Sequence, residues 1–177
     1  MPTTPVVAMV MAPIHLLTYS ALLGTELYQS FIMTKVAFQA LPRSAFTSLQ
    51  KRVFPIYFKS QSLLLILVAL TLPPYGPASV VHNKSDWVPL VIAGGTAALN
   101  LSVYGPRTLR FMVERVHQTT RDSKPLTDSK EISVEMKRLN RLFSKAHAMS
   151  IHLNLISIIA TLCYGWRLSS KLSFEAA

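Results

Sequence analysis

Ionisable and amide side chains recur at helical spacing inside apolar stretches of the chain, and they are the residues that could do chemistry. His15, Tyr19, Glu26 and Gln29 are separated by steps of four, seven and three residues, which places them on one face of a helix. A carboxyl in such a stretch could relay a proton or accept hydrogen bonds. Because an apolar environment disfavours the charged form, we expect Glu26 to be mostly protonated.

Polar residues at similar spacing recur in two later apolar stretches. They are Thr96 and Asn100, and then His147, Ser150, Asn154, Ser157 and Thr161. Lipid cannot satisfy polar groups, so these faces should point at one another. The expected partners of Glu26 are Thr96, Asn100, Asn154 or Ser157. Two interpretations stay open: the faces are interhelical hydrogen bonds, each worth about 0.6 kcal/mol, or they line a polar cavity for a substrate, proton or metal.

Metal ligation and motif-based catalysis find little support in the residue spacing. His147 and His152 are five residues apart, so on a regular helix they diverge by roughly 140°. The single cysteine, Cys163, excludes a thiolate-rich site. Glycine-rich phosphate loops and the GxSxG elbow are missing from the sequence. The sequence therefore predicts no metal site and no cofactor, and it leaves any catalytic residue unknown.

Four apolar segments must position these side chains. Half of the 177 residues are hydrophobic and only 15% are charged, against roughly 25% in soluble domains. The segments are residues 14–38, 55–72, 87–104 and 147–166, each close to the roughly 20 residues that cross a bilayer. The prediction is an all-α polytopic membrane protein, a bundle of four transmembrane helices forming one domain over residues 1–177.

Prolines and small residues refine the expected spans. Pro13 precedes the first span, Pro55 fits the first turn of the second, and Gly105-Pro106 interrupts the third. The segment AGGTAA at residues 93–98 lacks bulk, which predicts close approach of another helix.

The net charge of +10 is read as membrane topology, and we expect no nucleic-acid binding. Basic residues gather in the first and third loops, which predicts that these loops are cytoplasmic and that both termini are non-cytosolic. No Lys or Arg precedes Lys35, so an arginine-rich mitochondrial presequence is not expected. An endomembrane or plasma membrane is therefore favoured over a mitochondrial one, with the organelle undetermined.

The third loop, residues 105–146, is expected to form basic, amphipathic cytoplasmic helices. Asp128 and Glu131 resemble a capping box. An apolar stripe follows, and four basic residues lie off it: Lys137, Arg138, Arg141 and Lys145. These four predict a surface for anionic lipid headgroups. The alternative, that this helix packs on the other cytoplasmic helix, stays open.

Several short motifs resemble the transmembrane protein 205-like family, a membrane domain of unknown biochemical function. They are His15-Leu16-Leu17, Gly24 and Phe31, Leu41-Pro42-Arg43 followed by FPIYF at residues 54–58, Pro106-Arg107-Thr108, and HAMSIHLNL at residues 147–155. The resemblance covers about three quarters of the chain and implies a four-span helical membrane protein. Two positions depart from the family pattern: Ala148 stands where a glycine is usual, and Glu26 where glutamine is frequent.

These observations favour a structural or interaction component of a membrane, or a small transport-related bundle with a polar interior. A membrane-protein partner or a second copy of the chain fits the first role. The alternative is a small four-span membrane enzyme, such as one of the anthrone-oxygenase type, although this comparison rests on architecture alone.

Overall fold

The computed structural model describes residues 5–73, 76–79, 84–122 and 132–171. Within these ranges the chain is all helical and contains no strand. The elements are α1 (Pro5–Leu27), the π-helical turn η1 (Tyr28–Met33), α2 (Thr34–Ala40), α3 (Arg43–Leu70), the 3₁₀ turn η2 (Gly76–Ala78), α5 (Lys84–Leu99), the π-helical turn η3 (Asn100–Tyr104), α6 (Gly105–Asp122) and α7 (Val134–Ser169). The predicted all-α fold is confirmed for this part of the chain.

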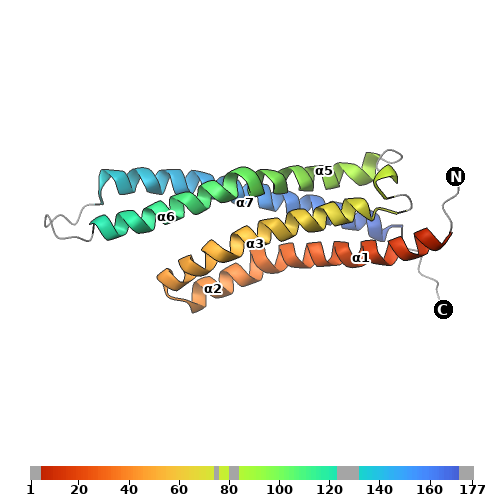
Figure 1. Cartoon of the computed structure of the whole chain (residues 1–177), viewed down its shortest axis with the longest axis horizontal. Helices are drawn as coiled ribbons and strands as arrows, with labels where there is room; N and C mark the ends of the chain where they lie inside the picture. The colour runs from red at the N-terminus through yellow and green to blue at the C-terminus, as the bar shows by residue number, and fades with distance from the viewer. Residues whose placement is uncertain (1–4, 74–75, 80–83, 123–131, 172–177) are drawn as a thin grey trace.

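The helices form two long hairpins that lie side by side (Figure 1). One hairpin pairs α1 and α2 with α3, and the other pairs α5 and α6 with α7. The start of α1 and the end of α7 lie at the same end of the molecule. At that end α5 also contacts α3, so the two hairpins are joined there. Towards the opposite end, α2 and the first half of α3 diverge from α6 and α7 (Figure 1).

The joined end holds the apolar core. Its buried residues come from α1, α3, α5 and α7 and from Leu72 just after α3: Tyr19, Leu22, Leu65, Val68, Leu72, Leu90, Ala93, Ala97, Ala160 and Tyr164. Ala93 and Ala97 are fully buried, so small side chains do permit close helix approach here. Gly94 and Gly95 face open space. The close approach predicted from AGGTAA is therefore made by its alanines.

Among the described residues, three helical stretches are long and apolar enough to cross a membrane, judged by length and composition: Arg43–Leu70, Asp86–Asp122 and Val134–Ser169. They contain the predicted spans 55–72, 87–104 and 147–166 almost completely. The run of α1, η1 and α2 is not among the stretches found within the described residues. A span at residues 14–38 therefore stays a prediction.

The interpretation of the prolines as helix boundaries was wrong. Pro13 lies inside α1 and Pro55 lies inside α3. The α3 helix instead begins at Arg43, after Leu41 and Pro42 adopt extended backbone. An internal proline removes one helical hydrogen bond. The remaining bonds have no water to replace them in an apolar setting, so the helix continues through the proline.

Gly105-Pro106 does not interrupt the third helix either. The backbone passes through the π-turn η3, in which the Gly105 N–H donates to the carbonyl of Asn100. This turn leads directly into α6, which contains Pro106. The extra residue of a π-turn loosens the helix where proline supplies no N–H. A bend therefore takes the place of the predicted break.

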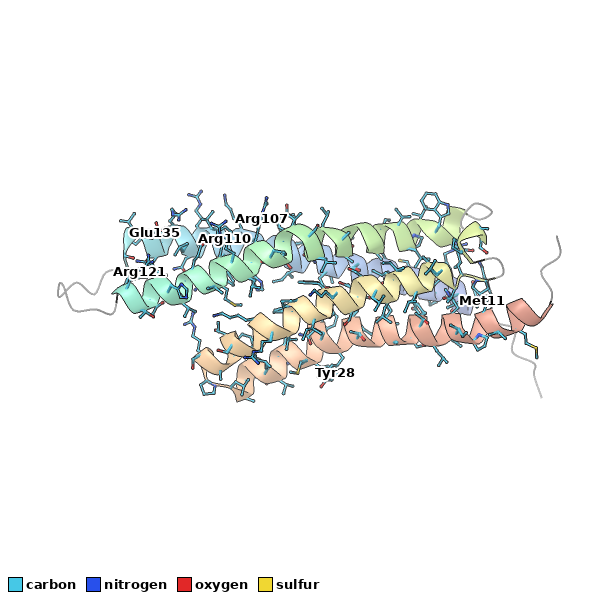
Figure 2. All side chains as sticks on the ribbon, in the orientation of Figure 1. Met11, Tyr28, Arg107, Arg110, Arg121 and Glu135 are labelled. Carbon is cyan, nitrogen blue, oxygen red and sulfur yellow. The ribbon has the colours of Figure 1, made fainter. Side chains whose placement is uncertain are left out.

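Residues 134–146 of the predicted third loop are the first part of α7. Ser133 caps α7 by accepting a hydrogen bond from the Met136 N–H at 3.1 Å. The predicted capping residues Asp128 and Glu131 lie outside the described residues. Arg121 and Glu135 lie at the end of the molecule opposite Met11 (Figure 2). Here α6 packs on α7, and Leu139 is buried, as one of the two open interpretations had it.

Candidate functional site

A cleft of about 610 Å³ opens between the diverging parts of the two hairpins. Its walls come from η1, α2, α3, η3, α6 and α7. Most lining side chains are apolar, and five are aromatic phenylalanine or tyrosine rings from α3 and α7: Phe46, Phe54, Tyr57, Phe58 and Phe143. The volume lies within the roughly 300–1,000 Å³ typical of small-molecule sites.

The two π-turns η1 and η3 border this cleft. Gln29 and Phe31 of η1 line one side, and Leu101 of η3 lines another. The carbonyl of Gln29 in η1 accepts hydrogen bonds from both the backbone N–H and the hydroxyl of Thr34, the first residue of α2, and the hydroxyl lies at 2.8 Å. Single π-turns are uncommon and frequently occur at functional sites. Their positions are a second feature, independent of cleft volume, that marks this region.

The α3 wall carries an aromatic ladder. Phe46, Phe54 and Phe58 fall on one helical face, because their positions differ by eight and four residues. The Phe54 and Phe58 rings stack with centroids 6.1 Å apart. On α7, Phe143 stacks on His147 at 5.2 Å. Flat apolar surfaces therefore dominate two walls of the cleft.

Glu26 lies at the centre of a buried polar network that adjoins the cleft. Its Oε1 accepts hydrogen bonds from Gln61 Nε2 at 2.7 Å and from Ser157 Oγ at 3.0 Å. Glu26, Gln61 and Ser157 are each fully buried. The network thus joins α1, α3 and α7 in the middle of the bundle.

Asn154 connects the Glu26 network to the cleft, which it lines. Its Oδ1 accepts from the Tyr57 hydroxyl at 2.7 Å and from Gln61 Nε2 at 3.5 Å. Its Nδ2 donates to Ser30 Oγ at 2.8 Å. Since Tyr57 and Ser30 also line the cleft, the polar interior of the bundle reaches the cleft surface at this point.

A second polar cluster lies at the joined end of the bundle. His15 Nε2 and the Tyr164 hydroxyl are hydrogen-bonded at 2.5 Å, and His15 Nδ1 lies 3.1 Å from Thr71 Oγ1. The Tyr19 hydroxyl donates to the backbone carbonyl of Thr161 at 3.3 Å. His15 therefore makes interhelical hydrogen bonds far from the cleft.

The predicted polar residues fall into four groups. Glu26 and Ser157 meet directly, and Asn154 is one step away. Cleft-lining positions are held by Gln29, His147, Ser150 and Asn154. The joined-end cluster contains His15, Tyr19 and Thr161. Two expected partners of Glu26 bond elsewhere: Thr96 donates to the Ile92 carbonyl of its own helix, and Asn100 donates to the Ser150 carbonyl.

Important residues of α3 were missed from the sequence. Gln50, Tyr57 and Gln61 are buried, and they differ in position by seven and four residues. That spacing was the signal that could have placed them on one face. Gln50 lies in the predicted first loop, whereas Tyr57 and Gln61 lie inside the predicted span 55–72, where their shared face is the unused signal.

Two ion pairs to one carboxylate lie near the surface at the joined end. Arg167 Nε lies 3.1 Å from Asp86 Oδ1, and Lys171 Nζ also bonds the Asp86 carboxylate. These ion pairs tie the start of α5 to the end of α7. Arg167 and Lys171 are substantially exposed, so the pairs contribute modestly to stability.

The four basic residues predicted to meet lipid are all exposed. Arg138 pairs with Glu135 at 2.7 Å, and this hydrogen bond holds the pKa of the Glu135 carboxyl below its usual range. Further basic side chains, Arg107, Arg110 and Arg121, lie along α6 (Figure 2). In the part of the chain that the structure describes, no group of three His, Cys, Asp or Glu residues could hold a metal ion.

Fold and site together define an all-helical bundle with membrane-compatible helices and a lateral cleft. The chain belongs to the family described as Domain of unknown function (DUF4149), whose model matches residues 17–117. It is also 46% identical over 160 residues to Xanthocillin biosynthesis cluster protein D of Aspergillus fumigatus, and the match covers 90% of each chain. No solved structure matches the chain significantly. The resemblance to the transmembrane protein 205-like family stays an interpretation of the sequence.

Proposed function

We propose that this protein is a four-span membrane protein that binds a small, mainly apolar molecule in its lateral cleft, in a role related to transport or delivery. The observation that carries the proposal is the cleft of about 610 Å³, with aromatic walls and a polar floor at Asn154. Small-molecule sites commonly combine apolar walls with a few fixed polar groups. The lateral opening would admit a molecule from the membrane.

The surface of α1 supports the first span. Leu17 is 71% exposed, whereas His15 and Glu26 on the same helix are buried. Tyr28 also points away from the bundle (Figure 2). Large apolar groups outside and ionisable groups inside invert the order expected in water. Lipid around α1 accounts for both sides of this distribution.

The proposed topology places the diverging ends of the hairpins in the cytoplasm. Arg107, Arg121 and the basic start of α7 lie towards that end, and cytoplasmic loops are enriched in such residues. Both termini are then non-cytosolic. The exposed basic side chains are proposed to contact anionic headgroups of the inner leaflet.

The related protein from Aspergillus fumigatus supports a small molecule as the occupant. Its name places it in a biosynthesis cluster, which would give a membrane binding protein a diffusible substrate, intermediate or product to handle. We extend that context to this chain as part of the proposal.

The test is purification of the full chain from its native membranes, followed by mass spectrometry of extracted small molecules. Ile151 lines the cleft and is 52% exposed, whereas Ile159 lies outside the cleft on the same helix and is 51% exposed. Ile151→Trp should reduce the bound molecule several-fold, and Ile159→Trp should not. Equal retention by both variants, or no enriched small molecule in the wild type, would refute the binding role.

A membrane enzyme is the second candidate, because an imidazole borders the cleft. His147 lines it together with Ser150 and Asn154 of the same helix, so a proton acceptor and hydrogen-bonding groups face one space. If the protein is an enzyme, His147→Gln should abolish turnover while the fold and ligand retention persist. A binding protein should keep the copurified molecule chemically unchanged in both forms.

A further inference from the structure

One buried amide oxygen on a side chain that lines the cleft has no partner. Gln50 of α3 is only 4% exposed and lines the cleft, yet its Oε1 makes no hydrogen bond within the described residues. Leaving a buried polar group unsatisfied costs about 1–3 kcal/mol. Buried amides are normally satisfied by protein or by a bound molecule. Because Gln50 forms part of the cleft wall, rotation of its side chain would present the amide to a molecule in the cleft.

The aromatic ladder frames this amide. Phe46 lies one turn before Gln50 and Phe54 one turn after it, on the same face of α3. All three side chains line the cleft. A group bonded to the amide would therefore hold the rest of its molecule against aromatic rings, which favour stacked or edge-on contact with another ring.

A hydroxyl from a second wall is also unsatisfied. Thr108 of α6 lines the cleft, and its buried Oγ1 has no hydrogen-bond partner among the described residues. An amide both donates and accepts, and so does a threonine hydroxyl. A ligand hydroxyl can complement either of these two groups, because it both donates and accepts hydrogen bonds.

From this arrangement we infer that the cleft selects an aromatic molecule that carries a hydroxyl group, with the hydroxyl bonded to Gln50 and the ring held among Phe46, Phe54 and Phe143. The inference rests on the proposed binding function and names its ligand class. A lipid acyl chain could fill the apolar walls but would leave the Gln50 amide unsatisfied. The polar group is therefore what distinguishes the two occupants.

The experiment compares two probes on the full-length protein in detergent. One is 2-naphthol, and the other is 2-methoxynaphthalene, which keeps the ring system and loses the hydrogen-bond donor. The wild type should bind 2-naphthol about tenfold more tightly, the preference expected from one buried hydrogen bond. Affinities come from the ligand-dependent rise in thermal stability, measured against protein-free micelles for probe partitioning.

Variants assign the preference to the amide. Gln50→Leu should reduce the affinity ratio to nearly one, mainly by weakening 2-naphthol. Gln39→Leu is the matched control, because Gln39 is exposed and lies outside the cleft, and it should keep the wild-type ratio. Since Leu removes an unpartnered polar group, Gln50→Leu should fold at least as stably as the wild type, so loss of folding does not obscure the result.

The outcomes separate the two proposals. Equal binding of both probes to the wild type, or a preference that survives Gln50→Leu, overturns the ligand class and leaves the cleft-binding role standing. If the wild type, Gln50→Leu and Gln39→Leu all fail to bind both probes, the proposed binding role of the cleft is overturned. A stoichiometric phospholipid that 2-naphthol cannot displace would assign the cleft to lipid and overturn both.

Discussion

Substitution of Glu26 tests whether the centre of the bundle is held by neutral hydrogen bonds. Glu26→Gln keeps a carbonyl oxygen at the position of Oε1, which accepts from Gln61 and Ser157. Glu26→Leu keeps the approximate volume but removes the acceptor. Glu26→Lys introduces a buried cation with no carboxylate among the network residues Gln61, Ser157 and Asn154.

The structure sets the size of each effect. Glu26 accepts two hydrogen bonds, and interhelical bonds in membrane proteins average about 0.6 kcal/mol with a maximum near 1.7. Gln61 Nε2 retains Ser157 Oγ at 3.1 Å as an alternative acceptor, which reduces the free-energy cost of removing the Glu26 carboxyl. Glu26→Leu should therefore cost about 1–2 kcal/mol, Glu26→Gln less than about 0.5, and Glu26→Lys about 3 or more.

The assay is the free energy of unfolding in mixed micelles titrated with a denaturing detergent. Thr96→Val is the control, because the Thr96 hydroxyl bonds only to the backbone of its own helix and the change should cost less than about 0.5 kcal/mol. If Glu26→Gln lowers the free energy of unfolding as much as Glu26→Lys does, the network requires the charged carboxylate, and the hypothesis of neutral hydrogen bonds is wrong. If all three variants match the wild type, the network contributes nothing to stability.

Three further predictions concern packing, lipid and topology. A Cβ at Gly165 would overlap the Tyr19 hydroxyl, so Gly165→Ala should lower the free energy of unfolding by about 1–3 kcal/mol. As the control, Gly95→Ala lies in open space and should stabilise the helix slightly. Equal effects of the two substitutions would refute the close contact at Gly165. Arg141→Gln should release more anionic lipid than Arg138→Gln in native mass spectrometry, because Arg138 is already paired with a carboxylate; equal loss would show that the ion pair does not compete with lipid. A reporter sequon on a C-terminal extension should be glycosylated, since both termini are predicted to be non-cytosolic; a protease-accessible cytosolic terminus would reverse the topology.

Helical periodicity was enough to find three of the four residues of the central network, Glu26, Asn154 and Ser157. Glu26 and Ser157 were each recognised as polar positions on an apolar helix, and the structure brings them within 3.0 Å. The same rule could have found Gln61. It could not have paired the residues correctly, because the partner of a side chain depends on how the helices pack. Asn100 shows this, since it bonds to a backbone carbonyl instead of to Glu26.

The cleft itself was beyond sequence reasoning for a different reason. Its walls depend on two π-turns, and neither Gln29 nor Asn100 carries a sequence mark of the extra backbone residue in its turn. The prolines were predicted to mark helix boundaries that the structure does not have, because the rule that proline ends a helix assumes water as the alternative hydrogen-bond partner. In lipid that alternative is lost, and Pro55 remains inside α3.

The two hairpins are joined at one end and diverge at the other, so each can move as a lever arm about the joined end. From Val134 to Gly165, the arm contributed by α7 is about 45 Å long at 1.5 Å per residue. A tilt of about 5° at the joined end would move the tip of such an arm by roughly 4 Å. That is enough to change which rings touch a molecule between the arms. Substitutions among Ala93, Ala97 and Gly165, which set the fit at the pivot, would thereby alter ligand selection without contacting the ligand.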